Sequence, residues 1–184
     1  MLNKNMTKKE IEDLLNTKGD FVKIDYLTRF LKNDPPLELK KFANVKLAEL
    51  YFKKGLFVDA AKCYDSAGNF SIPFSEKIKN YVKAVEMFVK AASFERADYE
   101  MKKALSEGNA NQRNEIYFNV KYIYRTQGEI YEKEKKKNNA IRVYEKFLEM
   151  KLNTQEKEEI KEKLLRLYED LGKFREAERL KGLY

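Results

Sequence analysis

The chain has no histidine and no tryptophan, and its 184 residues include a single cysteine, Cys63. Without histidine, the commonest general base and metal ligand is missing. One cysteine without histidine excludes an ordinary structural zinc site, a Cys–His nucleophile pair and a disulfide framework. We therefore expect no metal and no cofactor, and we expect Cys63 to be a reduced thiol, as is typical of cytosolic proteins.

Turn-forming residues and long apolar runs are also scarce. The chain has 7 glycines and 3 prolines, too few for the frequent turns of an all-β protein. The glycines are isolated, so no Gly-rich phosphate loop is present. No apolar run approaches the roughly 20 residues that span a bilayer, and residues 1–10 lack the hydrophobic stretch of a signal peptide. These absences predict an all-α protein located in the cytoplasm.

Charged residues make up 37% of the chain, yet no group of them indicates catalysis. Acidic pairs such as Glu158 with Glu159 lie among many other acids, and we interpret them as solvated helix faces. We therefore predict that the protein is not an enzyme.

The net charge of +8 raises the question of nucleic-acid binding. The basic excess is spread along the chain: residues 1–40 carry 8 basic and 7 acidic residues, and residues 121–160 carry 10 and 8. No long stripe that would follow phosphates is visible, which argues against nucleic acid. The densest basic cluster, between Lys133 and Lys137, falls at an expected turn, and we interpret it as solvated. A local contact for phosphate, acidic protein or anionic lipid is the alternative.

One pattern recurs along the chain. Its residues are separated by gaps of 3, 4, 5, 4 and 3, and the clearest copy contains Ala48, Tyr51, Gly55, Ala60, Tyr64 and Ala67. These gaps suit two helices folded back at a tight turn, because each set of residues then shares one helix face. Gly55 falls where the first helix must stop, since glycine takes the left-handed conformation without a Cβ clash.

Three further copies follow in the same frame, and a degenerate copy precedes them. The registration points at the second helices are separated by 36, 37, 43 and 37 residues, and they are Ile24, Ala60, Ala97, Ala140 and Ala177. The place of Gly55 is taken in the later copies by Ala92, Lys135 and Gly172. Periods of this length mark arrays in which each helix pair needs a neighbour to bury its apolar face.

On these residues the chain resembles the tetratricopeptide repeat (TPR) family, well over residues 36–184 and weakly over 8–32. The usual repeat has about 34 residues, and every copy here is longer. The longer pairs, and the stretch GEIYEKEKKKNNAIRVYEKF, are similar to the soluble attachment proteins (SNAPs), which recruit the ATPase that disassembles membrane-fusion complexes. The resemblance implies a right-handed solenoid of antiparallel helix pairs, with about ten helices in a single domain, 1–184. Its parts would be a degenerate pair at 8–32 and repeats at 36–70, 74–108, 111–150 and 154–184.

Local signals predict where the helices begin. Thr7 with Glu10 is typical of a capping box, and Gly19 is expected to close that first helix. Asp20 is predicted to cap the second helix, and Asp34 the third, with Pro35 as its first residue. The later first helices are expected to start at Ser71 or Ser75, at Asn111 and at Thr154.

In the TPR family the first helix of each pair lines a concave groove, so the resemblance also implies where a partner binds. The inward positions are Phe42, Val45, Glu49, Phe52 and Lys53 in the first repeat, Val82, Glu86, Val89 and Lys90 in the second, and Tyr122, Arg125 and Glu129 in the third. The proposed apolar anchors are Phe42, Phe52, Val82 and Tyr122. We expect Glu49, Glu86, Arg125 and Glu129 to set register and charge preference.

A groove of this composition suits an amphipathic helix or an extended peptide with apolar anchors and a basic end. The alternative is that Phe42, Val45, Phe52 and Val82 pack against the neighbouring pair. Family members that grip the C-terminal carboxylate of heat-shock chaperones carry a lysine and an asparagine where Val45 and Glu49 stand here. We therefore expect no such clamp.

Two other segments are unusually apolar. Residues 70–74 join two helix pairs and are expected either to pack as a hydrophobic staple or to project as a wedge toward a membrane or a partner. The last residues, Leu180, Leu183 and Tyr184, include no polar capping helix. We expect them to pair in a homodimer, to be covered by a partner, to reflect a truncation, or to fold back over their own repeat.

Together these observations predict a non-catalytic scaffold or adaptor that binds a partner protein or peptide in its groove. A SNAP-like cofactor of membrane fusion or trafficking, with peripheral membrane contact, is one alternative. A basic RNA-binding helical repeat protein is the other.

Overall fold

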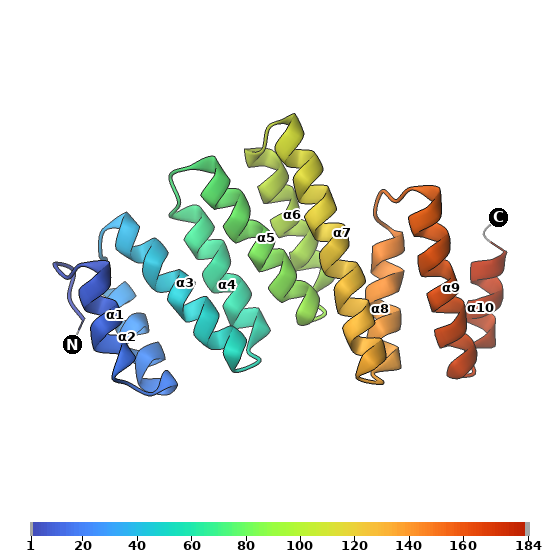
Figure 1. Cartoon of the computed structure of the whole chain (residues 1–184), viewed down its shortest axis with the longest axis horizontal. Helices are drawn as coiled ribbons and strands as arrows, with labels where there is room; N and C mark the ends of the chain where they lie inside the picture. Colours follow the sequence, from blue (N-terminus) through green and yellow to red (C-terminus); the bar gives the residue numbers. More distant parts are fainter. Residues whose placement is uncertain (1, 183–184) are drawn as a thin grey trace. The chain divides into compact units, whose positions relative to one another are not determined.

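The computed structural model describes residues 2–182, and this part of the chain forms ten α-helices and no strand (Figure 1). The predicted all-α class and number of helices are therefore confirmed. In chain order the helices are α1 (Lys8–Asn16), α2 (Asp20–Lys32), α3 (Leu37–Lys53), α4 (Phe57–Asn69), α5 (Phe74–Lys90), α6 (Phe94–Glu107), α7 (Ala110–Lys133), α8 (Lys137–Leu148), α9 (Thr154–Asp170) and α10 (Phe174–Lys181). Within the described residues, no helix is both long enough and apolar enough to pass through a bilayer.

By its internal contacts the chain divides into two compact units, Met1–Ile116 and Tyr117–Tyr184. The first unit holds α1 to α6 and the start of α7. The second unit holds the rest of α7 together with α8, α9 and α10. The single domain of four repeats remains a prediction.

Four tight turns, which join α3 to α4, α5 to α6, α7 to α8 and α9 to α10, share one geometry. In each turn one residue has a positive φ: Gly55 (73°), Ala92 (52°), Lys135 (58°) and Gly172 (67°). The next residue donates its N–H to the carbonyl five residues earlier, at 2.8 to 2.9 Å, which satisfies an orphan carbonyl of the helix end. The left-handed conformation predicted at Gly55 is confirmed. The same conformation occurs at the three positions that the sequence pattern aligns with it.

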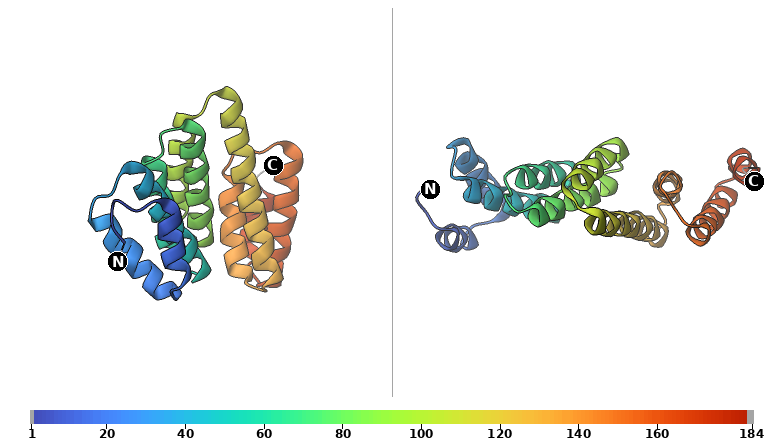
Figure 2. Two further views of the ribbon diagram at one scale, coloured as in Figure 1. Left: turned by 60° about the vertical axis from the view of Figure 1, so that its left-hand side comes forward. Right: turned by 90° about the horizontal axis from the view of Figure 1, so that it is seen from above.

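In the first unit, α3 packs on α4, α4 on α5 and α5 on α6, and these neighbours run side by side in each view (Figure 1, Figure 2). Small residues allow the close approach, since Ala48, Ala60 and Ala67 are all fully buried. Gly68 of α4 lies directly against the ring of Tyr81 on α5. The alanines of the recurring pattern therefore mark helix-to-helix contacts.

In the second unit, α9 packs on both α8 and α10. The rings of Tyr124 on α7 and Phe147 on α8 are stacked, with their centroids 6.1 Å apart. Gly128 of α7 leaves room for the ring of Tyr144 on α8. Both tyrosines and Phe147 are at most 1% exposed, so this contact is the interior of the unit.

The capping box predicted at the first helix is confirmed. The Glu10 N–H donates to Thr7 Oγ1 at 3.3 Å, and the Thr7 N–H donates to Glu10 Oε2 at 2.7 Å. The predicted start of α9 at Thr154 is confirmed, and Asn153 caps this helix in a similar box with Glu156. Helix α7 begins at Ala110, and Asn109 Oδ1 accepts from the Gln112 N–H at 3.0 Å.

Three other predicted helix starts are wrong. Gly19 caps α2, and Asp20 is its first residue. Helix α3 is capped by Pro36 and begins at Leu37, while Asp34 has a φ of 50°. The reason is the proline pair: a residue before proline avoids the helical region, so Pro35 does not begin a helix ahead of Pro36. Helix α5 begins at Phe74 after Pro73, so neither Ser71 nor Ser75 caps it.

Candidate functional site

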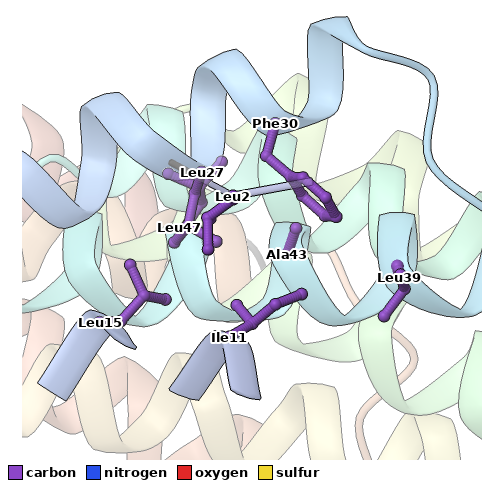
Figure 3. Packing of buried hydrophobic residues seen from close by; sticks show 8 residues of the cluster. All are labelled: Leu2, Ile11, Leu15, Leu27, Phe30, Leu39, Ala43 and Leu47. Carbon is purple, nitrogen blue, oxygen red and sulfur yellow. The ribbon is translucent and has the colours of Figure 1, made fainter. Parts of the chain in front are cut away.

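A cleft of about 400 Å³ lies between α1, α2 and α3. Its apolar lining consists of one leucine from each helix: Leu15, Leu27 and Leu50. Leu15 and Leu27 belong to the buried cluster that ties these helices together, and Figure 3 shows this cluster between the three ribbons. The cleft therefore has a fixed apolar floor.

One end of the cleft is rich in carboxylates. Lys46 Nζ lies 2.7 Å from Glu12 Oε1 and 4.0 Å from Glu49 Oε2. A single lysine thus faces two glutamates, and this end carries an excess of one negative charge. The side chain of Glu49 is 52% exposed, so its carboxylate remains accessible to a partner.

The other end is rich in lysines. Lys23 and Lys53 line it together with the exposed amide of Asn16. Lys53 Nζ lies 3.1 Å from Asp20 Oδ2, and Lys54 Nζ lies 3.9 Å from the same atom. The hydrogen bond from Lys53 lowers the pKa of Asp20, so this carboxyl stays ionised at neutral pH. Three lysines sharing one aspartate leave this end positive.

Of the groove residues predicted in the first repeat, Glu49 and Lys53 line the cleft. Phe42 packs against the buried cluster of α1, α2 and α3 and is partly buried, as the packing alternative expects. Val45 is also partly buried. Phe52 is 45% exposed, lies 6.1 Å from the ring of Phe57, and is not part of the cleft.

In the second repeat, Val82 and Glu86 are partly buried, and Glu86 pairs with Lys90 at 3.6 Å. Val89 is fully buried, so its side chain is closed to a partner and is removed from the proposed surface. The reason is that α5 is packed on two sides, by α4 and by α6. A helix covered on two sides buries positions that would face solvent on an edge helix.

In the third repeat, Tyr122 is 64% exposed, and Phe118, one turn earlier on α7, is 72% exposed. They line a small hollow of about 80 Å³ with Lys121, Arg125 and Glu156. The cations of this surface face α9, since Lys121 pairs with Glu156 at 2.7 Å and Arg125 with Glu159 at 3.2 Å. Glu129 likewise pairs with Lys163 at 3.2 Å. Arg125 and Glu129 therefore already have partners within the second unit.

The sequence pattern does not predict most of the cleft: the degenerate pair at 8–32 has no assigned groove residues, and Lys46 and Leu50 lie beside the inward positions assigned to the first repeat. The residues missed are Glu12, Leu15, Asn16, Lys23, Leu27, Lys46 and Leu50. In the frame that aligns Ile24 with Ala60, the inward positions of residues 8–16 include Asn16, which aligns with Phe52 and does line the cleft.

In the apolar segment 70–74, Ser71 is anchored by hydrogen bonds, and the two apolar residues Ile72 and Phe74 are exposed. Ser71 is buried; its hydroxyl donates to the Ala67 carbonyl at 2.8 Å and accepts from Asn80 Nδ2 at 3.2 Å. Ile72 and Phe74 are 69% and 61% exposed. These two side chains project outward, as the wedge interpretation expects, whereas the staple interpretation would bury them.

At the other apolar segment, Leu180 is buried, and Leu183 and Tyr184 lie outside the described residues.

A partly buried charge cluster lies between α4, α5 and α6. Lys103 forms an ion pair with Asp65, and its Nζ is 3.6 Å from Glu100 Oε2. The same ammonium sits 4.3 Å from the centroid of the Tyr81 ring, whose hydroxyl donates to Asn69 Oδ1 at 3.0 Å. Burial, followed by the negative charge of Asp65, raises the pKa of Glu100, which is only 4% exposed. Asp65, Glu100 and Lys103 connect α4 with α6, and none of them lines either cavity described above.

Other reactive or metal-binding chemistry is limited. Burial raises the pKa of the Cys63 thiol to about 12, so the nucleophilic thiolate is scarce at neutral pH. Over residues 2–182 no group of three or more His, Cys, Asp or Glu side chains is arranged to hold a metal ion. No family model, curated protein or solved structure matches the chain.

Proposed function

We propose that the protein is a non-catalytic adaptor that binds a segment of a partner polypeptide in the cleft between α1, α2 and α3. The observation that carries the proposal is the cleft itself, which combines a leucine floor with charged groups of both signs at its rim. Three of the nine lining residues are leucines and the other six are polar or charged, so the cleft suits a ligand that carries both apolar and charged groups. A polypeptide offers both apolar side chains and charges of either sign.

We also propose that the helix pairs belong to a TPR-like right-handed solenoid. The proposal rests on the recurring sequence pattern and on the shared geometry of the turns at Gly55, Ala92, Lys135 and Gly172. In such arrays the inner faces of first helices bind partner segments. The cleft fits this description, since α3 is the first helix of a pair and supplies Glu49 and Lys53.

The charge distribution favours a polypeptide over nucleic acid. Lys46 and Lys53, which line the cleft, and Lys121 and Arg125, on the surface of α7, are each paired with a carboxylate within 3.2 Å. Binding phosphates would separate these pairs and bring the carboxylates near the phosphate charge. We therefore expect partner affinity to depend only mildly on salt, unlike nucleic-acid binding, which weakens steeply as salt rises.

The test is affinity capture from the source cell's lysate at about 150 mM salt, followed by mass spectrometry, with a nuclease-treated sample in parallel. The matched variants are a charge swap at the cleft, Glu49→Lys with Lys53→Glu, and an equivalent swap on the exposed face of α6, Glu95→Lys with Lys102→Glu. We expect a defined set of proteins that survives nuclease, is lost with the cleft swap and is kept with the α6 swap. Equal capture by both swaps would contradict the proposed site.

A second candidate function is a peripheral membrane contact through Ile72 and Phe74. The observation in its favour is that both apolar side chains are mostly exposed, Ile72 on the loop before α5 and Phe74 at the first residue of α5, next to the buried Ser71–Asn80 hydrogen bond. We expect the protein to float with liposomes, and we expect the double change Ile72→Ser with Phe74→Ser to abolish flotation. Phe21→Ser, at another exposed aromatic residue, is the control and should have no effect. Protein that stays at the bottom of the gradient excludes this function.

A further inference from the structure

We infer that the segment held in the cleft carries an apolar side chain between a basic residue and an acidic residue, and that its basic residue lies at the negative end of the cleft. This inference rests on the proposed function and adds the chemistry of the partner to it. It follows from three features of the cleft: the apolar floor, the negative end and the positive end.

The leucines at the bottom of the cleft favour an aliphatic side chain in the partner segment. Leu15 and Leu27 are at most 5% exposed and form the packed wall behind the cleft, so the leucine surface that a partner contacts at the bottom is mainly that of Leu50, which is partly buried. A cleft of about 400 Å³ accommodates one large side chain and the neighbouring backbone. A polar side chain at this position would lose its water without gaining a hydrogen bond.

The negative end selects the basic residue. Glu12 and Glu49 share Lys46, which lies closer to Glu12, at 2.7 Å against 4.0 Å. Glu49 therefore has the weaker internal partner and the more accessible carboxylate. A lysine or arginine of the partner that approaches Glu49 would balance the charge at this end.

The positive end selects the acidic residue. Asp20 faces Lys53 and Lys54, and Lys23 adds a third cation nearby. Lys53 is 71% exposed, so its ammonium is free to turn from Asp20 toward a partner carboxylate. The amide of Asn16 at the same rim is available to hydrogen-bond the partner's backbone.

The direction of the charges follows from the order of residues on α3. Glu49 and Lys53 are one helical turn apart, about 6 Å along the axis at a rise of about 1.5 Å per residue, with Leu50 between them in the sequence. A partner segment that presents basic, apolar and acidic side chains on one face would match negative end, floor and positive end in that order. Binding with these charges reversed would place like charges together at both ends.

The experiment is selection of a displayed library of random 12-residue peptides on the full-length chain at about 150 mM salt. The most enriched peptide is then synthesised and titrated against four proteins: wild type, Glu49→Lys, Lys53→Glu and the control Lys102→Glu. We expect enriched peptides to carry the basic–apolar–acidic order, read in either chain direction, because the charges of the cleft do not fix which end of the peptide comes first. Each cleft change should weaken binding about tenfold, the control should change it less than twofold, and a peptide whose basic residue is replaced by glutamate should recover affinity for the Glu49→Lys protein.

The outcomes separate this inference from the function beneath it. If no peptide is enriched above the bare support, peptide binding itself is contradicted. If peptides are enriched but lack the charge order, or bind equally to wild type, Glu49→Lys and Lys53→Glu, the adaptor function stands and the inferred partner chemistry is wrong. Circular dichroism of each variant confirms that a loss of binding is not a loss of fold.

Discussion

We predict that replacing either of two glycines within helices lowers stability, because a tyrosine ring occupies the space of the missing side chain. A Cβ at Gly68 would lie 2.4 Å from Cε1 of Tyr81, and a Cβ at Gly128 would lie 2.2 Å from Cε1 of Tyr144. Neither ring is free to retreat. The Tyr81 hydroxyl donates to Asn69 at 3.0 Å, and the Tyr144 hydroxyl donates to Glu132.

The expected size of the effect comes from one favourable and two unfavourable contributions. Alanine is favoured over glycine in a helix by about 1 kcal/mol. Forcing a methyl group into a packed core costs about 1–3 kcal/mol, and displacing the ring would also break its hydrogen bond, at about 1 kcal/mol. We therefore expect Gly68→Ala and Gly128→Ala each to lower the free energy of unfolding by about 1–3 kcal/mol.

The assay is urea unfolding followed by circular dichroism, fitted with one or two transitions because the chain has two compact units. Asn119→Ala, at an exposed position of α7, is the control for helix propensity and should stabilise by about 0.5 kcal/mol. Replacing Tyr144 by valine removes the ring that the new methyl group would contact. Gly128→Ala should therefore lower the free energy of unfolding by less in a Tyr144→Val background than in the wild type. If either glycine variant is more stable than wild type, the close contact does not constrain the helices as described.

Three further predictions concern stability and reactivity. Ala60→Leu should destabilise the protein by about 1–3 kcal/mol in urea unfolding, because Ala60 is fully buried between helices; an unchanged midpoint would refute this packing. Burial raises the pKa of Glu100 from 4.5 to about 7, so its stabilisation is complete below pH 4.5 and is lost as pH rises through 7. Urea midpoints at pH 5, 6, 7 and 8 should therefore fall for wild type relative to Glu100→Gln, and parallel curves would contradict the assignment. Cys63 should react slowly with a thiol reagent at pH 7 and rapidly in urea; rapid labelling of the folded protein would show that the thiol is accessible.

The turns illustrate what the sequence could predict. Gly55 and Gly172 follow from the chemistry of glycine, which takes a positive φ at low cost. Ala92 and Lys135 carry no such local signal, and only their alignment with Gly55 places them in the same conformation. The recurring pattern was therefore more informative than residue type at these two turns.

Helix starts and burial were less predictable, because they depend on neighbours. Asp34 is a favourable capping residue in isolation, but the two prolines that follow it delay the helix to Leu37. Val89 was expected to face a partner, and it is buried because α4 and α6 both pack on α5. Helical periodicity predicts which residues of α5 share a face, but it does not show that two helices pack against α5.

The cleft could be predicted only in part. Glu49 and Lys53 follow from their positions on a first helix, but the floor needs Leu15, Leu27 and Leu50 to converge from three helices. Their convergence is a tertiary contact that periodicity does not specify. The charge separation between the two ends depends in turn on which lysine pairs with which carboxylate, and this becomes known only from the structure.

The most direct test of the adaptor function is site-specific photo-crosslinking in the source cell. A photo-reactive amino acid would replace Asn16, which is exposed at the rim of the cleft, and in a second protein Lys102, which is exposed on α6. We predict discrete crosslinked polypeptides from position 16 and none from position 102. No adduct at position 16, or the same adducts at both positions, would contradict the assignment of the cleft as the partner-binding site.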